Sequence, residues 1–544
     1  MTRKIRLRAA YLLPLLTGLP LGACGAIPEP DGGTGGSSGS SATGGVAQGG
    51  ASQGGASSGG LGQGGTVAMG SGGGGGFASG GTPTSSGGTA GMTGVGAAGA
   101  SIGGSAGAPM GGTSGGAAAG AGGGAAGAPG TGGTDGGTPG GGAGGATAGA
   151  GGEDTGGNGG AAGSPPVNSG STENTGADCQ VTAGELAKNN NFPDPFAMND
   201  GTRITTKEQW RCRRNEIKKD LEKYEIGTKP EPPTVAASLQ GNTLNVTVTT
   251  NAGSIMLSSS VSSPGGGGPH CVAIGMNGNS SLISGCVQVP FKHDQVVAYA
   301  GGTGSQKQTD PFYEVYPDLW GQIGNYNAWS WGISRLIDGL EQVKDELNID
   351  MSRIGVHGCS YAGKMALFAG ALDERIALTV AQESGGGGIN SWRTSQSFTS
   401  RTGTNIEKID NTNYAWFKSS MKNLDPYSLP HDHHELIAMI APRAIIALGN
   451  PGYEWLGDES GYKSLMAAKE VFKALGVEDH IGFDFTGNHG HCQAPQGQQQ
   501  AVSAFVNKFL KGQDANTSIA VQPQQGGFDL NYQSLIDWET PTLQ

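Results

Sequence analysis

A stretch of glycine, alanine, serine and threonine from Asp31 to Gly170 constrains the fold of this chain more than any other feature. The chain has 544 residues and 105 glycines, and most of the glycines lie before residue 170. Because almost no aromatic or long aliphatic side chain interrupts this stretch, it cannot bury enough apolar surface to offset the entropy lost on ordering. We therefore expect a disordered Gly-rich linker over residues 25–177 and a folded catalytic domain over 178–544, which holds all eight tryptophans.

The first 24 residues have the layout of an export signal. Basic residues between Arg3 and Arg8 precede an apolar run, Ala9–Leu21, which is too short to span a membrane. Leu-Gly-Ala before Cys24 resembles the lipobox of a bacterial lipoprotein, and the alternative is an ordinary signal peptide that contains a cysteine. We expect a secreted or cell-envelope protein that meets the membrane only through a lipid on Cys24. The linker, a coil of about 145 residues, would then be a tether with a reach of roughly 60 to 70 Å.

Charge and cysteine content narrow the partners and the compartment. The net charge is −12 and the folded part has no basic cluster, which argues against a nucleic-acid partner. Of seven cysteines, six remain when Cys24 is set aside, and no C-x-x-C pair occurs among them. An even number in an exported chain favours three disulfides over zinc ligation and leaves fifteen pairings open. The six are Cys179, Cys212, Cys271, Cys286, Cys359 and Cys492.

Strand-like and helix-like patterns alternate through the folded part. Alternating or short apolar runs predict strands at 244–248, 271–275, 353–356, 376–381, 443–448 and 481–485. Apolar residues at three- and four-residue steps predict helices at 206–224, 333–347, 364–372 and 502–510. This alternation predicts an α/β fold with a mainly parallel sheet and helices on both faces.

The segment Gly358–Lys364 is a candidate nucleophile turn. Ser360 stands between a predicted strand and a predicted helix, where a tight turn exposes the hydroxyl and the helix offers N–H groups to an oxyanion. Glycines on both sides allow close approach, although the second one, Gly363, lies one residue later than in G-x-S-x-G. An ordinary serine in a Gly-flanked turn is the alternative.

An acid and a histidine follow Ser360 in the order that α/β-hydrolases use. Glu383 comes after the strand at 376–381, and His491 comes after the strand at 481–485. Asp458, after the strand at 443–448, is an alternative acid. His489 is interpreted as a loop residue. The order predicts an α/β-hydrolase three-layer sandwich with a Ser-acid-His triad.

Three motifs resemble those of the glucuronoyl esterases, carbohydrate esterase family 15. Gly358-Cys359-Ser360 with Gly363-Lys364 resembles G-C-S-R-x-G-K, Gln382-Glu383-Ser384-Gly385 resembles Q-E-S-G, and His491-Cys492 resembles H-C. The resemblance runs from Cys179 to the C-terminal region, about two-thirds of the chain. It implies that Ser360 is the nucleophile, His491 the general base and acid, and Glu383 the orienting carboxylate.

The resemblance also implies disulfide pairings. Cys359–Cys492 matches a family bridge between the nucleophile turn and the histidine loop, and Cys179–Cys212 matches an N-terminal bridge. Ser391 and Gly461 stand where a further family bridge has its cysteines. Cys271 and Cys286 are then left to each other.

Substrate contacts are implied in the same way, with departures. Lys364 and Trp455 match residues that contact the sugar, whereas Glu407 stands in place of a binding Gln and Asn413 falls near a binding Glu. Tyr361 replaces an Arg that assists the oxyanion. Its hydroxyl, or N–H groups of Tyr361 and of residues 276–278, could donate instead.

Two further groups have structural interpretations. His431, His433 and His434 form an H-x-H-H run, which rarely closes a zinc site without a distant ligand. Trp329 and Trp331 are interpreted as core residues and not as a sugar platform.

The order of Ser360, Glu383 and His491 predicts a serine esterase. The resemblance implies that it hydrolyses esters of the (4-O-methyl-)glucuronic acid carboxyl, as in lignin–glucuronoxylan cross-links. We expect a monomer with no metal and no organic cofactor. The alternatives are an esterase of the same fold for another carbohydrate or acetyl ester, and a non-catalytic polysaccharide-binding protein.

Overall fold

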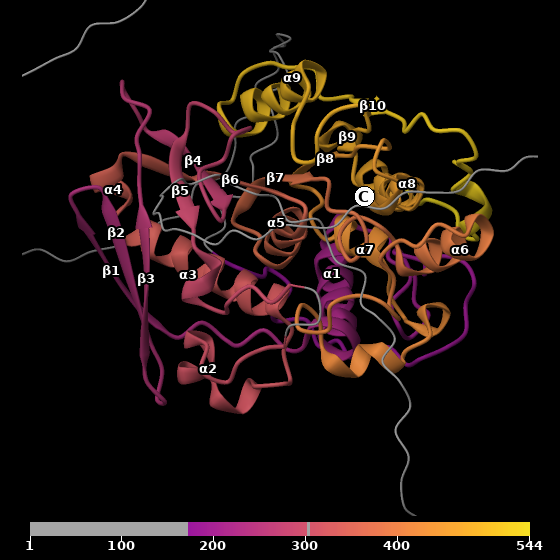
Figure 1. Cartoon of the computed structure of the whole chain (residues 1–544), viewed down its shortest axis with the longest axis horizontal. Coiled ribbons are helices and arrows are strands. Elements are labelled where there is room, and N and C mark those ends of the chain that lie inside the picture. Colours follow the sequence, from indigo (N-terminus) through magenta and orange to yellow (C-terminus); the bar gives the residue numbers. More distant parts are fainter. Residues whose placement is uncertain (1–171, 302–304) are drawn as a thin grey trace, which may run out of the picture. The chain divides into compact units, whose positions relative to one another are not determined.

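The computed structural model of the chain describes residues 172–301 and 305–544 (Figure 1). The expected export signal, the lipidation residue Cys24 and residues 25–171 of the expected linker lie outside the described residues. No helix in the described ranges is long and apolar enough to cross a membrane.

A seven-stranded parallel sheet forms the centre of the domain, with strand order β10-β9-β8-β7-β6-β4-β5. The strands are β4 (His270–Met276), β5 (Val287–Phe291), β6 (Ile349–Cys359), β7 (Ile376–Gln382), β8 (Ala444–Leu448), β9 (Ile481–Asp484) and β10 (Ala520–Val521). Each strand predicted from 271 onwards is present. The α/β-hydrolase fold is confirmed.

Both faces of this sheet are buried, as expected for parallel strands. On β8, Ile445 and Ala447 belong to the larger core under α3, α5 and α8, whereas Ile446 and Leu448 belong to a second core under α9. Figure 1 shows α9 on one side of the sheet and α3 and α5 on the other. The helices are α1 (Lys207–Leu221), α2 (Pro311–Val315), α3 (Asn325–Gln342), α4 (Lys344–Leu347), α5 (Tyr361–Leu372), α6 (Trp392–Thr402), α7 (His433–Ala438), α8 (Asp458–Ala474) and α9 (Gln496–Phe505).

A smaller antiparallel sheet of β1 (Thr234–Gln240), β2 (Thr243–Thr249) and β3 (Ser254–Ser260) packs against α3. The alternating residues of β2 are buried, as predicted. Gly339 permits this contact, since a Cβ there would lie 2.3 Å from Val246 Cγ2. Trp329 and Trp331, both on α3, are fully buried, which confirms their interpretation as core residues.

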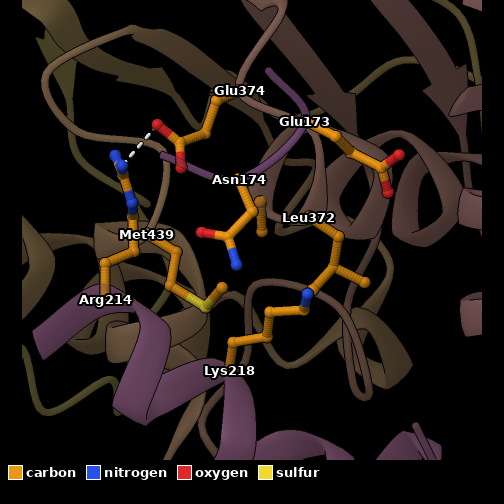
Figure 2. Close-up of a pocket in the computed structure, with 8 residues that line it drawn as sticks. Glu173, Asn174, Arg214, Lys218, Leu372, Glu374 and Met439 are labelled. Atoms are coloured by element: carbon orange, nitrogen blue, oxygen red, sulfur yellow. Dashed lines mark hydrogen bonds and ion pairs between the residues drawn. The ribbon is translucent and has the colours of Figure 1, made fainter. Parts of the chain in front are cut away.

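The first described residues are bound into the domain ahead of the boundary expected at 178. The Glu173 carboxylate lies 2.5 Å from Lys229 Nζ and 2.7 Å from Arg335 Nη2, and both cations are buried. Thr175 donates its N–H and hydroxyl to the Glu374 carboxylate, which also pairs with Arg214 (Figure 2). Because buried cations need a counter-charge, Glu173 is part of the fold.

Candidate active site

Ser360 lies in a strained turn between β6 and α5. Its backbone has φ 58° and ψ −126°, a conformation that L-residues rarely adopt, and its N–H donates to Gln382 O on β7. A Cβ on Gly358 would lie 2.1 Å from Ala362 O, and one on Gly363 would lie 2.4 Å from Gln382 O. Both glycines are therefore required for the turn, even though the second is displaced by one position.

His491 and Glu383 form a hydrogen-bonded pair at the carboxyl ends of the strands. His491 Nδ1 lies 2.6 Å from Glu383 Oε2, and the other carboxylate oxygen accepts the Cys492 N–H at 3.1 Å. Glu383 is 1% exposed, with φ 45°, and its own N–H donates to Leu448 O on β8. The carboxylate thus holds the Nδ1–H tautomer and leaves Nε2 as the base.

A disulfide joins Cys359 to Cys492, the residues adjacent to Ser360 and His491. A ring nitrogen of His491 lies within 4.8 Å of Cys359 Sγ. Within the described part of the chain Ser360 Oγ makes no hydrogen bond. In serine hydrolases the hydrogen bond between the serine and its histidine base commonly tightens only when substrate binds. The bridge limits how far the two loops can separate. The other disulfides are Cys179–Cys212 and Cys271–Cys286, so all three pairings implied by the resemblance are present.

The alternative acid, Asp458, bonds elsewhere. It begins α8 and accepts the Asn450 N–H at 2.7 Å, with no hydrogen bond to His491. Burial raises the pKa of Asp458 to about 7. The nearby Glu383 charge adds to this rise, and the hydrogen bond from the Asn450 N–H opposes it. His489 bonds Thr486 O and Asn450 and is a loop residue.

Tyr361 follows the nucleophile at the first position of α5. Its hydroxyl lies 3.0 Å from Asn277 Nδ2 and 3.2 Å from His293 Nε2. Burial raises the pKa of Tyr361, so the hydroxyl stays protonated at neutral pH. The Asn277 N–H donates to Phe291 O and is not available to an oxyanion, whereas the Tyr361 N–H lies in the first turn of the helix, where N–H groups lack helical partners.

The residues matched to sugar contacts divide into two groups. Lys364 forms an ion pair with Glu407 and lies 4.7 Å from the centroid of the Trp416 ring. The other Glu407 oxygen accepts the Thr412 hydroxyl at 2.6 Å. Trp455 is 43% exposed, and its ring packs edge-on against that of His491 at 4.9 Å.

Asn413 is not joined to this group by a hydrogen bond. Its side-chain amide donates to Ala300 O, and its side-chain oxygen accepts the Ala415 N–H at 2.9 Å. Both polar atoms therefore bond backbone groups, one of them in a segment 113 residues away along the chain.

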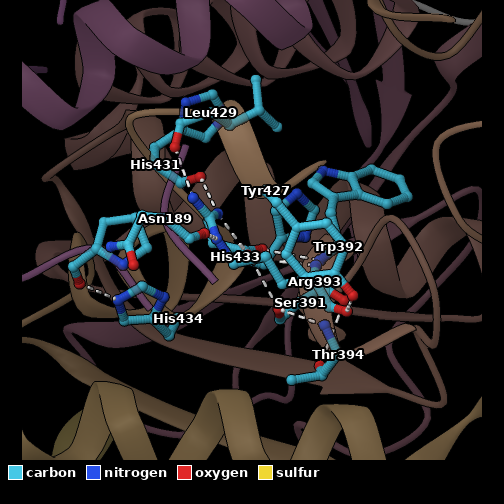
Figure 3. Close-up of polar contacts among 12 residues, drawn as sticks. Asn189, Ser391, Trp392, Arg393, Thr394, Tyr427, Leu429, His431, His433 and His434 are labelled. Atoms are coloured by element: carbon cyan, nitrogen blue, oxygen red, sulfur yellow. Dashed lines mark hydrogen bonds and ion pairs between the residues drawn. The ribbon is translucent and has the colours of Figure 1, made fainter. Parts of the chain in front are cut away.

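The histidine run at 431–434 has no metal-site geometry. His431 and His433 both bond Glu225, and His434 bonds Pro193 O. Figure 3 shows the three histidine side chains among their polar neighbours. Among the described residues, the one group of three close potential ligands is Cys359, His491 and Cys492, in which the cysteines are oxidised to a disulfide.

Sequence reasoning missed two residues of this region. The Tyr453 hydroxyl accepts the His491 N–H at 3.1 Å, and Trp416 lies under Lys364. Tyr453 stands two residues before Trp455, which could have pointed to it, whereas no local pattern identifies Trp416. Asn277 was expected to contribute a backbone N–H to the oxyanion, but its side-chain amide instead donates to the Tyr361 hydroxyl.

The arrangement suits acyl transfer: a half-buried serine on a strained turn, a histidine paired with a buried carboxylate, and N–H groups at a helix start. A family profile described as "Glucuronyl esterase, fungi" matches residues 246–476. A 4-O-methyl-glucuronoyl methylesterase from Thermothelomyces thermophilus is 42% identical over 341 residues, which cover 60% of this chain and 83% of that protein.

Solved structures of glucuronoyl esterases are also similar to this chain. The glucuronoyl esterase catalytic domain from Hypocrea jecorina has a TM-score of 0.61 at 37% identity, covering 66% of this chain and 98% of that one. A mutant glucuronoyl esterase from Sporotrichum thermophile, in complex with methyl 4-O-methyl-β-D-glucopyranuronate, has a TM-score of 0.62 at 36% identity, covering 67% and 100%.

Proposed function

The chain belongs to the glucuronoyl esterase family, and from this premise we propose that it hydrolyses esters of the (4-O-methyl-)glucuronic acid carboxyl with Ser360 as nucleophile. The chain is a carboxylic ester hydrolase of this family. The observation that supports these residue roles best is the 2.6 Å hydrogen bond between His491 and Glu383, held beside Ser360 by the Cys359–Cys492 disulfide.

In the first half-reaction, His491 Nε2 takes the proton of Ser360 Oγ while Oγ bonds to the ester carbonyl carbon. The resulting oxyanion accepts the Tyr361 N–H, and the Glu383 carboxylate stabilises the imidazolium. The bond from carbon to the alcohol oxygen then breaks, and His491 returns its proton to the departing alcohol. Water next attacks the acyl-Ser360 ester with His491 as base, which releases the uronate and restores the serine.

We place the uronate ring beside Ser360, between the side chains of Lys364 and Trp455. The Lys364 ammonium and the Glu407 carboxylate can hydrogen-bond sugar hydroxyls, and the exposed Trp455 ring offers an apolar face. In plant cell walls such esters would join glucuronoxylan to lignin alcohols. No metal or organic cofactor enters the proposed mechanism.

We also propose that this catalytic domain acts as a monomer on a tether. Residues 1–24 would direct export, Cys24 would carry a lipid, and residues 25–171 would link the anchor to the domain at the cell surface. Labelling cells with radioactive palmitate tests this proposal: label that disappears in Cys24→Ala supports it, and equal labelling of both forms contradicts it.

The esterase proposal is tested by hydrolysis of benzyl and methyl glucuronate with the full chain beside Ser360→Ala. Turnover that the substitution abolishes is the expected result. Acetylated xylan is the comparison substrate, and faster release of acetate than of uronate would favour a different ester. Binding to glucuronoxylan with no turnover of any ester, from a folded protein, would overturn the enzymatic assignment.

A further inference from the structure

Four consecutive glycines, Gly385–Gly388, come almost directly after Glu383. Glycine loses more conformational freedom on folding than any other residue, so such a loop must be held by its surroundings. Gly385 and Gly387 have φ values of 55° and 67°, which favour glycine. Within the loop, the Gly388 N–H donates to Gly385 O at 3.0 Å.

This glycine loop is the surface on which Glu407 rests. A Cβ on Gly386 would lie 2.4 Å from Glu407 Cβ, and one on Gly387 would lie 3.0 Å from Glu407 Oε1. The absence of side chains thus lets Glu407 approach the loop and pair with Lys364. A shift of the loop would move Glu407 with it.

His433, at the start of α7, holds the far end of the loop. Its Nδ1 lies 2.5 Å from Gly388 O, and its Nε2 lies 2.8 Å from Glu225 Oε1. The Gly388 carbonyl can only accept, so Nδ1 carries a proton. With Glu225 ionised, Nε2 also donates and the ring is an imidazolium. Figure 3 shows this ring beside Trp392, whose ring lies 5.0 Å away, and the histidine is fully buried.

Glu225 supplies the balancing charge. Its carboxylate also lies 3.0 Å from His431 Nε2 and 3.2 Å from Trp392 Nε1. Although burial opposes ionisation, His433 and the other donors lower the pKa of Glu225 to about 2. Burial likewise opposes the charge on His433, but Glu225 raises the pKa of His433 above its usual value. The pair therefore remains ionised at neutral pH.

We propose that the buried His433–Glu225 ion pair is a positioning element for sugar binding: through Gly388 it fixes the glycine loop, and through the loop it fixes Glu407 and Lys364. This inference rests on the proposed function, in which Lys364 and Glu407 contact the uronate. The acid Glu383 depends on it less, since Leu448 O, the Cys492 N–H and His491 hold Glu383 separately. The expected signature is a change in KM, with kcat largely retained.

Two single substitutions separate the two bonds of His433. In His433→Asn the amide nitrogen takes the place of Nδ1 and keeps the donor to Gly388 O. In His433→Gln the amide nitrogen takes the place of Nε2, keeps the donor to Glu225 and leaves Gly388 O without one. On benzyl glucuronate we expect KM to rise about tenfold in His433→Gln and less than about threefold in His433→Asn.

If His433 served only the stability of the fold, both variants would be partly unfolded. Their kcat would then fall and their KM would stay unchanged. If His433→Gln does not fold, the pair Glu225→Gln and Glu225→Gln/His433→Phe replaces it. Glu225→Gln keeps the hydrogen bond from His433 to Gly388 O. Glu225→Gln/His433→Phe removes that bond and leaves no buried charge without a partner. Gly386→Ala, which would displace Glu407 directly, should raise KM without touching the ion pair.

A raised KM in Gly386→Ala beside unchanged KM values in the His433 variants would overturn the proposal, because the loop would then hold its position unaided. The wild-type chain and Ser360→Ala, assayed in parallel, report separately on the proposed function.

Discussion

The two halves of the active site differ in how their side chains are held. Around Ser360 the positions come from the chain path, since positive-φ residues, the strand ends and a disulfide fix the serine, the acid and the histidine. Around Lys364 they come from side-chain pairing with Glu407 and Trp416. A substitution can thus alter the proposed sugar-binding half while the proposed catalytic half keeps its geometry, and the departure at Glu407 belongs to the sugar-binding half.

Glu383→Gln should produce the largest effect. The amide can accept the His491 Nδ1–H but cannot stabilise the imidazolium, so kcat should fall roughly 10³- to 10⁴-fold with KM within about threefold of wild type. Steady-state kinetics on benzyl glucuronate measure both constants. Retention of most of the activity would mean that another carboxylate serves His491.

Lys364→Met probes the sugar-binding half. Loss of a charged hydrogen bond costs about 1.5 to 3 kcal/mol, so KM should rise about 10- to 100-fold while kcat changes less than about threefold. Glu407→Gln is the matched control, because it keeps the shape and frees the Lys364 ammonium, and it should change KM less. A fall in kcat alone would contradict the division between the halves.

Tyr361→Phe tests the boundary between them. Because Asn277 and His293 already bond the hydroxyl, and the backbone N–H survives the substitution, kcat should fall less than about threefold. A loss of the order of 10²- to 10³-fold would instead identify the hydroxyl as an oxyanion donor. Single-turnover measurement of acylation distinguishes the two results.

Asp458→Asn should have the smallest effect on catalysis, with kcat within about twofold of wild type. It should change the pH dependence of stability, because burial raises the pKa of Asp458 to about 7 from an unfolded value near 3.8. The folded state then binds the proton more tightly, so Asp458 lowers the free energy of unfolding as pH rises from about 4 to 7, by up to about 1.4 kcal/mol per pH unit.

Asp458→Asn removes this pH dependence of the free energy of unfolding, because the asparagine amide does not titrate. Urea unfolding at about pH 5 and pH 8 should show the variant gaining stability over wild type at the higher pH. The same pH dependence in both proteins would show that Asp458 does not titrate in this range.

Features encoded by neighbouring residues were predictable from the sequence. The parallel strands, the helix before β6 and the place of Ser360 at a strand-to-helix turn follow from local apolar patterns and glycines. The helix α8 was not predicted, although Leu465, Ala468 and Phe472 recur at helical spacing in the printed sequence. Strands β1 and β3 lack a strong pattern, because many of their residues are small or partly exposed. Strand β5 was not predicted either, although Val287, Val289 and Phe291 alternate along it.

Contacts between distant residues were not predictable from local patterns, and the distant disulfide pairings came from the resemblance alone. Glu225 and His433 are 208 positions apart, and nothing near either residue identifies the other as its partner. The histidine run gave an ambiguous signal because histidines that bind a metal and histidines that bond a carboxylate look alike in sequence. Asn413 matched a binding position only through the resemblance, and in the structure its side-chain amide donates to Ala300 O.

The ion pairs of Glu173 also determine how the domain would respond to a pulling force applied through the preceding chain. Tension from that side would act first on the contacts of Glu173 and Thr175 with Lys229, Arg335 and Glu374, as shear across buried charges. If these contacts broke, unravelling would stop a few residues later at the Cys179–Cys212 disulfide. This bond joins the chain segment under tension covalently to α1. The bridge would thus stop the chain from unravelling further towards the loops that carry Ser360, Glu383 and His491.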